Sequence, residues 1–272
     1  MSRKSMLQYV LQVVFLVAQF HSNFLMNASA SSLLYSNNFD AGLGSDYVKA
    51  GACYPYSLTS ASPDGGGNYA LRVIMKGMEG CEEANGEIKH RAMMRHGVGL
   101  RFAPRTPYWI GWRIFVPNDF PTGRDDASLI YGLMSGNTPG ETAFFIRGSK
   151  FTLLRRWSDA TGLNEVKEYE APVQKGKWTD FVIYTERSWE NDGVLKVWMD
   201  GKLVVNAIGK NATNYKNDPY MRTGIYWGTR DRSDNYTLYF DNVRVQSGAD
   251  GYDLVNPAIG LAAPLAPVWA SN

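Results

Sequence analysis

The chain has few side chains suited to metal or redox chemistry. Its 272 residues include three histidines and two cysteines. Only His90 and His96 follow the first 30 residues. Because metal sites of the zinc type draw several ligands from histidine and cysteine, this scarcity argues against such a site, and we expect none.

The chain also lacks net charge once its first 30 residues are set aside. That segment contains Arg3 and Lys4 and no acidic residue, so 28 − 2 = 26 basic residues face 26 acidic ones. No global basic field is left to attract a nucleic acid. We therefore expect no nucleic-acid partner.

No apolar run in the chain is long enough for a confident membrane span. Residues 6–20 are mostly apolar, follow the basic pair Arg3 and Lys4, and precede an A-x-A signal at 28–30. This order is typical of a cleaved secretory signal peptide, residues 1–30, and the apolar stretch is short for a membrane helix. We expect a secreted protein without a membrane partner after cleavage; the alternative is an uncleaved anchor.

Export gives the two cysteines a simple interpretation. In a secreted chain, Cys53 and Cys81 most simply form one disulfide, with two unpaired thiols as the alternative. Two sequons, at Asn211 and Asn235, are candidate glycosylation sites in a host that glycosylates.

Helical periodicity is also missing from every segment longer than about ten residues. Short alternating runs separated by turn signals predict strands instead. That pattern indicates a sandwich, jelly roll or barrel in one domain, residues 31–249, with a long loop over 41–67. The apolar, proline-containing tail, 250–272, is expected to pack loosely or to be disordered. The predicted strands are 33–40, 69–76, 87–96, 107–117, 128–135, 142–147, 150–157, 164–170, 181–184, 194–199, 202–205, 220–227 and 235–245.

The strongest local signal is the stretch from Trp178 to Val205. Two alternating apolar runs flank the polar break SWENDG, and Asp200-Gly201 then separates the second run from a third. An Asp-Gly pair between alternating runs is a strong hairpin signal. The stretch predicts three consecutive antiparallel strands.

Five motifs stand in order along the predicted strands and turns. They are YWIGWRIFVP (108–117), WTDFV (178–182), DGVLKVWMDGK (192–202), YMRTGIY (220–226) and YFDNVRV (239–245). Together they resemble motifs of the heparin lyase I-like polysaccharide lyases, a group that shares its concanavalin-like jelly roll of two antiparallel sheets with the glucuronan lyases. The resemblance covers roughly residues 33 to 247.

The resemblance implies cleavage of a uronate-containing glycan by β-elimination. A proton leaves C5, the adjacent carboxylate is neutralised, and the leaving oxygen is protonated. On the strand around 220–227, alternation puts Arg222 and Tyr226 on one face. Tyrosine can act as acid or base, and arginine binds carboxylates. Both residues are therefore catalytic candidates.

The segment 90–96 is a second candidate. The family has an R-x-E element on a comparable strand; here Arg91 matches the arginine and Met93 replaces the glutamate. Alternation puts Arg91, Met93 and Arg95 on one face, forming a cationic stripe, and His90 on the other. Arg91 and His90 are catalytic candidates, with a structural role at least as plausible for His90, and Arg95 is a candidate for substrate binding.

The strand around 128–134 departs from the family pattern. Many members carry glutamine and histidine there, where this chain has Gly132 and Met134. Either Tyr131, Arg147 or Arg91 takes over the missing role, or the protein binds glycan without cleaving it. Tyr131 and Arg147 are therefore candidates for substrate contact.

Other residues carry weaker expectations. Tyr184 and Trp198 are candidates for stacking on sugar rings, although aromatic side chains in a sandwich more often belong to the core. Asp40 and Asp241 are candidate ligands of a structural calcium, which needs six to eight oxygens. No cofactor is expected to be required.

These observations favour a secreted, monomeric polysaccharide lyase with an acidic polysaccharide as substrate. The alternative is a non-catalytic glycan-binding protein on the same jelly roll. A glycoside hydrolase ranks last, because it needs two positioned carboxylates and no strand offers such a pattern.

Overall fold

The computed structural model describes residues 33–77, 79–83, 85–122, 127–135, 140–213, 218–228 and 234–259. All of them belong to one unit of the chain, Leu33–Asn272. The predicted signal segment, 1–30, lies outside the described residues, as does 260–272 of the predicted tail.

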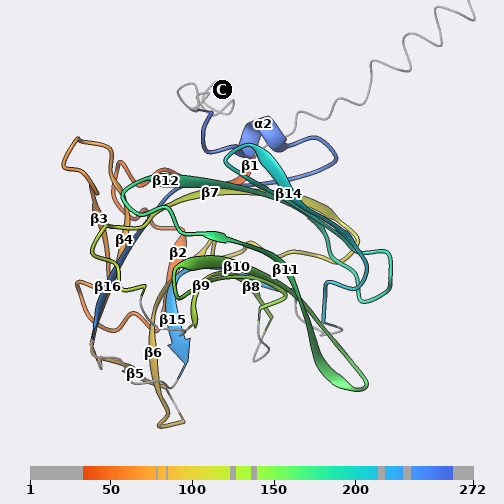
Figure 1. Ribbon diagram of the computed structural model, residues 1–272, viewed down its shortest axis with the longest axis horizontal. Coiled ribbons are helices and arrows are strands. Elements are labelled where there is room, and N and C mark those ends of the chain that lie inside the picture. Colours follow the sequence, from red (N-terminus) through yellow and green to blue (C-terminus); the bar gives the residue numbers. More distant parts are fainter. Residues whose placement is uncertain are drawn as a thin grey trace, which may run out of the picture. The chain divides into compact units, whose positions relative to one another are not determined.

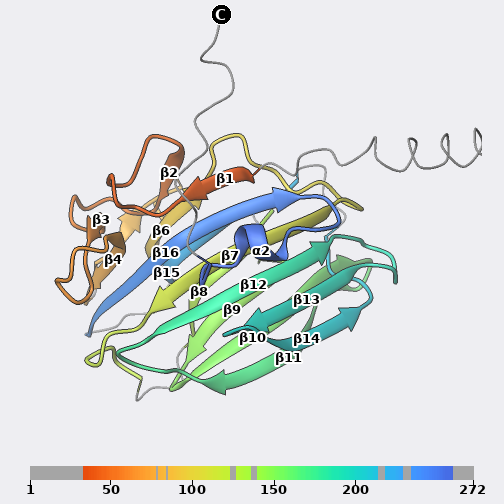
Figure 2. The same ribbon diagram turned by 90° about the horizontal axis from the view of Figure 1, so that it is seen from above.

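The described residues form two antiparallel sheets, which confirms the predicted all-β jelly-roll sandwich (Figures 1 and 2). In the first sheet, sheet A, the long strand β16 (Asn235–Ser247) pairs with β7 (Pro107–Phe115) on one side. On its other side it pairs with both β4 (Ala70–Lys76) and β1 (Leu33–Asn37). Sheet A contains, in spatial order, β14 (Lys202–Ile208), β13 (Val194–Met199), β12 (Trp178–Glu186), β7 (Pro107–Phe115), β16 (Asn235–Ser247), β4 (Ala70–Lys76) and β3 (Leu58–Ala61), with β1 (Leu33–Asn37) beside β16.

The second sheet, sheet B, lies against sheet A and carries the residues with candidate chemistry. Its spatial order is β11 (Gly162–Pro172), β10 (Lys150–Asp159), β9 (Thr142–Arg147), β8 (Ala127–Met134), β15 (Tyr220–Gly228), β6 (Ile88–His96) and β2 (Tyr47–Ala50), with β5 (Cys81–Glu82) paired to β6. The long loop expected over 41–67 is partly wrong, because it contains the short edge strands β2 and β3. Both have neighbours with which to form backbone hydrogen bonds.

The predicted three-stranded stretch is confirmed. Strand β12 pairs with β13, which pairs with β14. Asp200 and Gly201 connect β13 to β14 with φ values of 49° and 77°. Two consecutive positive φ values suit a two-residue hairpin turn, and glycine adopts such a value without steric cost.

An aromatic core holds the two sheets together. The ring of Trp112, on β7, lies 4.7 Å from Phe181 and 5.3 Å from Tyr131. Phe144, on β9, lies 5.5 Å from the same indole. Because all four side chains are almost fully buried, their packing fixes the sheets face to face.

The first part of the tail is packed, contrary to expectation. Tyr252–Val255 form helix α2, which lies on the outer side of sheet A (Figure 1). Val255 is fully buried. Arg244 of β16 donates hydrogen bonds to the carbonyls of Asn256 and Ile259, at 3.0 and 2.9 Å. No helix among the described residues has the length and apolar character to cross a membrane.

The predicted disulfide is present in the structure. Cys53 and Cys81 are bonded, with 5.8 Å between their Cα atoms and a sequence separation of 28. Restricting a loop of this length in the unfolded chain stabilises the fold by roughly 3–4 kcal/mol in the chain-entropy description. The bond also fixes β5 against the segment that follows β2.

Candidate functional site

The pairing of β6 with β15 places the predicted residues side by side. Arg222 is opposite Arg95, and Tyr226 is opposite Arg91. Directly opposed residues in an antiparallel pair point to the same face. The four side chains therefore share the outer face of sheet B, as the alternation predicts.

The two residues of β15 that alternate with Arg222, Gly224 and Tyr226 point into the sandwich. Thr223 and Ile225 are fully buried. Gly224 has a φ of 144°, and a Cβ there would come within 2.3 Å of the carbonyl oxygen of Ala92. A side chain at this position would push β6 away, so glycine is what lets the two site strands lie at hydrogen-bonding distance.

The arginines of this face gather around Tyr220. The guanidinium carbons of Arg95 and Arg222 lie 4.6 and 4.7 Å from its ring centroid. Burial lowers the pKa of Arg222, and the like charges of Arg91 and Arg95 lower it further. The interaction with Tyr220 raises this pKa. A bound anion would offset the cost of burying the Arg222 charge and the repulsion from the neighbouring arginines.

Arg91 extends this cluster toward Tyr226. Its guanidinium carbon lies 6.0 Å from the Tyr226 ring centroid, and it forms an ion pair with Glu83. Arg91, Arg95 and Arg222 line one pocket of about 470 Å³. The pocket is also lined by Val48, Lys49, Ala50, Gly51, Ala52, Cys53, Cys81, Glu82 and Glu83.

The floor beside the arginines is apolar. Strand β8 contributes Met134, while Gly132, opposite Arg222, contributes no side chain. Gly132 and Met134, where the family resemblance led us to expect glutamine and histidine, thus have no group for proton transfer or carboxylate binding. The buried members of this floor are Ala50, Met93, Leu129, Met134, Ala143, Phe145 and Leu154.

A second pair of arginines lies farther along the same sheet. The guanidinium carbons of Arg147, on β9, and Arg156, on β10, lie 5.0 and 5.1 Å from the Phe145 ring centroid. Phe145 belongs to the apolar floor. Arg147 is therefore on the same face as Arg222, as the substrate-contact prediction requires.

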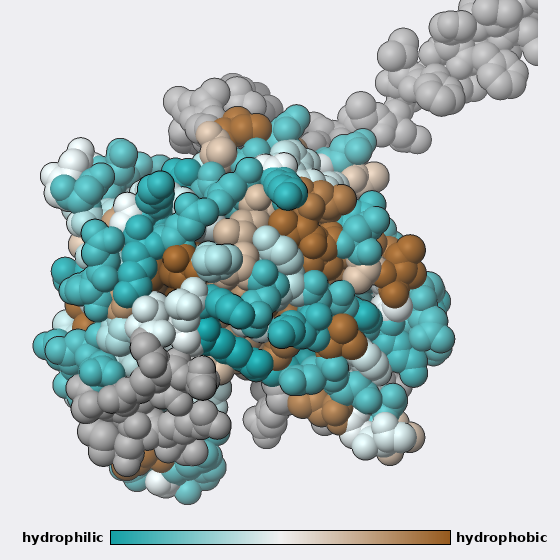
Figure 3. All heavy atoms as spheres, viewed as in Figure 1, coloured by the Kyte–Doolittle hydropathy of each residue, from teal (hydrophilic) through white to brown (hydrophobic). Residues whose placement is uncertain are grey.

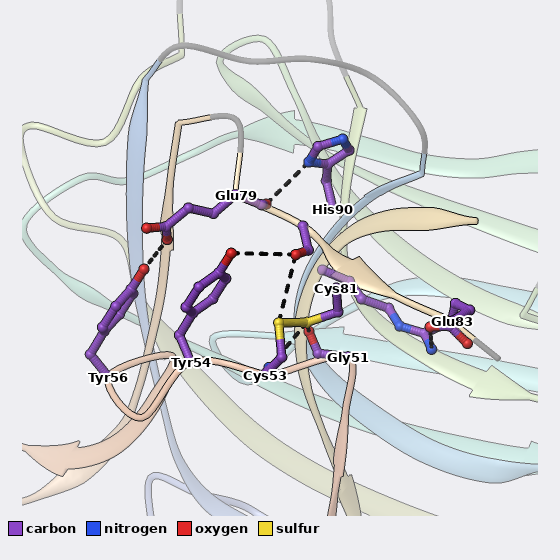
Figure 4. Close-up of a disulfide and its surroundings, with 10 residues drawn as sticks. Gly51, Cys53, Tyr54, Tyr56, Glu79, Cys81, Glu83 and His90 are labelled. Carbon is purple, nitrogen blue, oxygen red and sulfur yellow. Dashed lines mark hydrogen bonds and ion pairs between the residues drawn. A yellow bond between two sulfur atoms is a disulfide. The ribbon is translucent and has the colours of Figure 1, made fainter. Parts of the chain in front are cut away.

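His90 lies apart from these side chains. It is buried, and its Nδ1 is 3.1 Å from the backbone oxygen of Glu79, as Figure 4 shows. It alternates with Arg91 and so points to the opposite side of β6. This placement suits the structural role considered for it and does not bring the imidazole to the arginine cluster.

Tyr131 does not lie on this face, so its predicted contact with substrate is incompatible with the structure. It is fully buried and stacks on Trp112 in the core. The pairing of β8 with β9 shifts register between Leu129 and Tyr131. Because a bulge reverses the alternation, Leu129 lies in the outer floor and Tyr131 points inward.

Tyr184 and Trp198 belong to sheet A, so they cannot contribute to a site on sheet B. Their rings lie 4.8 and 5.7 Å from Trp109. Trp198 is also 5.2 Å from Tyr252 of α2. They form an aromatic cluster beneath the helix, and their expected role as sugar-stacking residues of the same cleft is not supported by this position.

The two sequons differ in accessibility. Asn211 is 1% exposed; its Nδ2 donates to the carbonyls of Glu186 and Val194 and its Oδ1 accepts from the backbone N–H of Ser188. A glycan cannot be attached there without breaking this packing, so the expectation for Asn211 does not fit the folded protein. Asn235 is exposed at the start of β16.

The described residues offer little support for a metal. No three His, Cys, Asp or Glu side chains among them come together in a way that could hold an ion. Burial raises the pKa of Asp241 to about 6, and the nearby charge of Asp40 adds a smaller upward shift. Calcium at this pair remains a prediction.

Two site residues are missing from the sequence prediction. Tyr220 has the same alternation signal as Arg222 and Tyr226, since it lies two residues before Arg222. Glu83 carries no comparable signal, because its contact with Arg91 depends on how the β5–β6 connection folds back over the strand.

Comparison with known families gives one match. The family model described as "Polysaccharide lyase" matches residues 50–244. A search of curated proteins finds no match.

Solved structures show the same fold at low sequence identity. An endo-β-1,4-glucuronan lyase from the fungus Trichoderma reesei is 15% identical, with a TM-score of 0.57, covering 86% of this chain and 96% of that one. The alginate lyase A1-II′, of polysaccharide lyase family 7, is 15% identical, with a TM-score of 0.53 and coverages of 72% and 86%. A GH131 β-glucanase catalytic domain from Podospora anserina is 11% identical, with a TM-score of 0.59 and coverages of 80% and 97%.

Proposed function

Since the chain belongs to the polysaccharide lyase family, we propose that this lyase cleaves a uronate-containing glycan by β-elimination on the outer face of sheet B. The match agrees with the family predicted from the motifs, while the finer likeness to heparin lyase I stays a prediction. The observation that carries the proposal is the cluster of Arg91, Arg95 and Arg222 beside Tyr226.

The carboxylate of the sugar is the first group to be recognised. Arg222 and Arg95 present adjacent guanidinium groups at the pocket. Their positive charge stabilises the carboxylate as it takes on the electrons released from C5, which is a preorganised electrostatic effect. Guanidinium groups also bind carboxylates through paired hydrogen bonds.

Proton transfer falls to Tyr226. Its half-buried side chain lies on the same face as Arg222 and beside Arg91. A tyrosine can remove the C5 proton or protonate the leaving oxygen when it is held within hydrogen-bond reach. Strand β8 supplies no such group here, and His90 points to the other side of β6. Of the two tyrosines that β15 places on this face, Tyr220 packs against the guanidinium groups of Arg95 and Arg222, so we assign proton transfer to Tyr226.

Export of the lyase forms part of the proposal. The predicted signal segment and the disulfide between Cys53 and Cys81 support an extracellular location, where disulfides persist. An acidic polysaccharide outside the cell is then the accessible substrate.

The decisive experiment is incubation of the purified mature protein with a panel of polyuronides and glycosaminoglycans. β-Elimination creates an unsaturated uronate, whose ultraviolet absorbance rises as cleavage proceeds. A rise with at least one uronate polymer, and none with a neutral glucan, supports the proposal. Binding without any rise would instead support the glycan-binding alternative, which the apolar residues Gly132 and Met134 favour.

A further inference from the structure

The acidic partner of Arg91 comes from a segment that the disulfide anchors. Glu83 follows Cys81 by two residues, and Cys81 is bonded to Cys53, which also lines the pocket. Figure 4 shows Cys53, Cys81, Gly51 and Glu83 together in this region. The backbone N–H of Glu83 donates to the carbonyl of Glu87 at 2.9 Å, closing the turn into β6.

Arg91 is confined from the other side by Gly51. A Cβ at Gly51 would come within 2.2 Å of Nε and 2.3 Å of Cγ of Arg91. The arginine stem therefore packs directly on the backbone between β2 and Cys53. With Glu83 on its guanidinium, Arg91 is held by groups on both sides of the disulfide.

This confinement gives Arg91 a different setting from Arg222. Arg91 has a carboxylate partner, whereas the charges that lower the pKa of Arg222 include Arg91 and Arg95. The Glu83 charge acts on Arg222 in the opposite sense, raising its pKa. One carboxylate at the rim thus offsets part of the repulsion among the three arginines.

We propose that Glu83 is a positioning residue for the elimination: with the Cys53–Cys81 disulfide it fixes Arg91 beside Tyr226, so that Arg222 and Arg95 receive the sugar carboxylate. The proposal rests on the proposed function. It assigns to Glu83 an effect on turnover, because a misplaced Arg91 disturbs the reacting geometry, and little effect on ground-state binding. A carboxylate that merely occupied the site until substrate displaced it would act on binding instead.

The test compares Glu83→Ala with Glu87→Ala in the disulfide-bonded protein. Glu87 is on the same turn and pairs with Lys89 at 3.1 Å, so the control removes an equal charge from the same segment. We expect Glu83→Ala to lower kcat roughly tenfold to a hundredfold, as small misplacements of reacting groups do, with KM on the uronate polymer changed by less than about twofold. Glu87→Ala should leave both constants unchanged.

Crystal structures of the two variants supply a readout independent of catalysis. We expect the Arg91 guanidinium to leave the Tyr226 ring in Glu83→Ala and to stay there in Glu87→Ala. If the wild-type protein cleaves no glycan, the proposed function fails, and these structures still decide whether Glu83 positions Arg91.

Two results would overturn the inference. A lower KM with unchanged kcat in Glu83→Ala would identify Glu83 as a carboxylate that substrate displaces. An unmoved Arg91 would show that Gly51 alone confines it.

The contribution of the disulfide is tested with the double variant Cys53→Ser, Cys81→Ser. We expect kcat to fall in the same direction as in Glu83→Ala, with folding verified by thermal unfolding. A folded double variant with wild-type kcat would remove the disulfide from the proposal. If the double variant does not fold, the comparison of Glu83→Ala with Glu87→Ala still decides the role of Glu83.

Discussion

The outer faces of the two sheets use similar residues in opposite ways. On sheet A, Arg113 donates to both carboxylate oxygens of Asp180, at 2.9 and 3.2 Å, and Trp109 donates to the carbonyl of Gly248 at 3.1 Å. On sheet B, Arg222 lies beside Arg95 instead of a carboxylate. The charge of Arg113 is thus balanced within sheet A, whereas under the proposed function Arg222 and Arg95 of sheet B receive an anion from the substrate.

The side of the molecule drawn in Figure 3 does not reveal this difference. The face in Figure 3 is mainly hydrophilic, with hydrophobic residues in separate groups. The two outer faces share one feature, because each has arginine side chains next to aromatic rings. What distinguishes the site is which charges have partners, because a desolvated arginine among like charges is stabilised by an anion that binds there.

The largest expected effect comes from Tyr226 on sheet B, with Tyr184 on sheet A as its control. Tyr226→Phe should lower kcat by roughly 10²-fold to 10⁴-fold, the range for losing a general acid or base, while glycan binding is retained. Tyr184→Phe, which removes a hydroxyl bonded to Glu186 on sheet A, should leave kcat unchanged. The absorbance assay measures both; near-full activity in Tyr226→Phe would remove that residue from the mechanism.

The next effect compares arginines. Arg222→Gln should reduce kcat/KM by roughly 10²-fold, as loss of one preorganised donor does. Arg113→Gln should leave kcat/KM close to wild type, because Asp180 already neutralises Arg113. Equal losses in the two variants, measured on the same polymer, would contradict the contrast between the faces.

Acid should weaken the core behind the arginine face. His96 lies between Tyr35 and Thr223, and burial lowers its pKa from 6.5 to about 3. Below pH 6.5 the unfolded chain takes up a proton that the folded chain does not, so stability falls as pH falls. From this proton alone we expect a loss of about 2 kcal/mol between pH 7 and pH 5.

Urea unfolding at the two pH values checks this. His96→Gln should lose correspondingly less stability over the same interval. An identical pH dependence in both proteins would show that other groups control acid stability.

The smallest expected effect concerns Arg147 on β9, two strands away from Arg222 on β15. Arg147→Gln should raise KM by a few fold for long uronate chains, because one charge contact at an open surface contributes little, and should leave KM for short oligomers unchanged. Lys150→Gln, in the neighbouring strand and paired with Glu170, is the control. If the KM of Arg147→Gln did not depend on the length of the uronate chain, the substrate would contact only the pocket around Arg222.

Much of the fold can be predicted from local patterns. The strands Thr142–Arg147 and Val194–Met199 match their predictions, because alternation and turn residues are local properties. The edge strands β2 and β3 are not predicted, since they have little alternation of their own and depend on their neighbours. Four residues of the candidate site, Arg91, Arg95, Arg222 and Tyr226, follow in the same way, from the alternation of β6 and β15.

The sequence by itself determined which side chains share a face of one strand, as for Arg222 and Tyr226, and predicted the pairing of the two cysteines that the structure confirms. Only the tertiary structure decided which sheet a strand joins, where a bulge turns Tyr131 inward, and that Glu83 reaches Arg91. The physical reason is the range of each interaction. Alternation is fixed by the backbone within a strand, whereas strand order, register and ion pairs depend on contacts between segments distant in sequence.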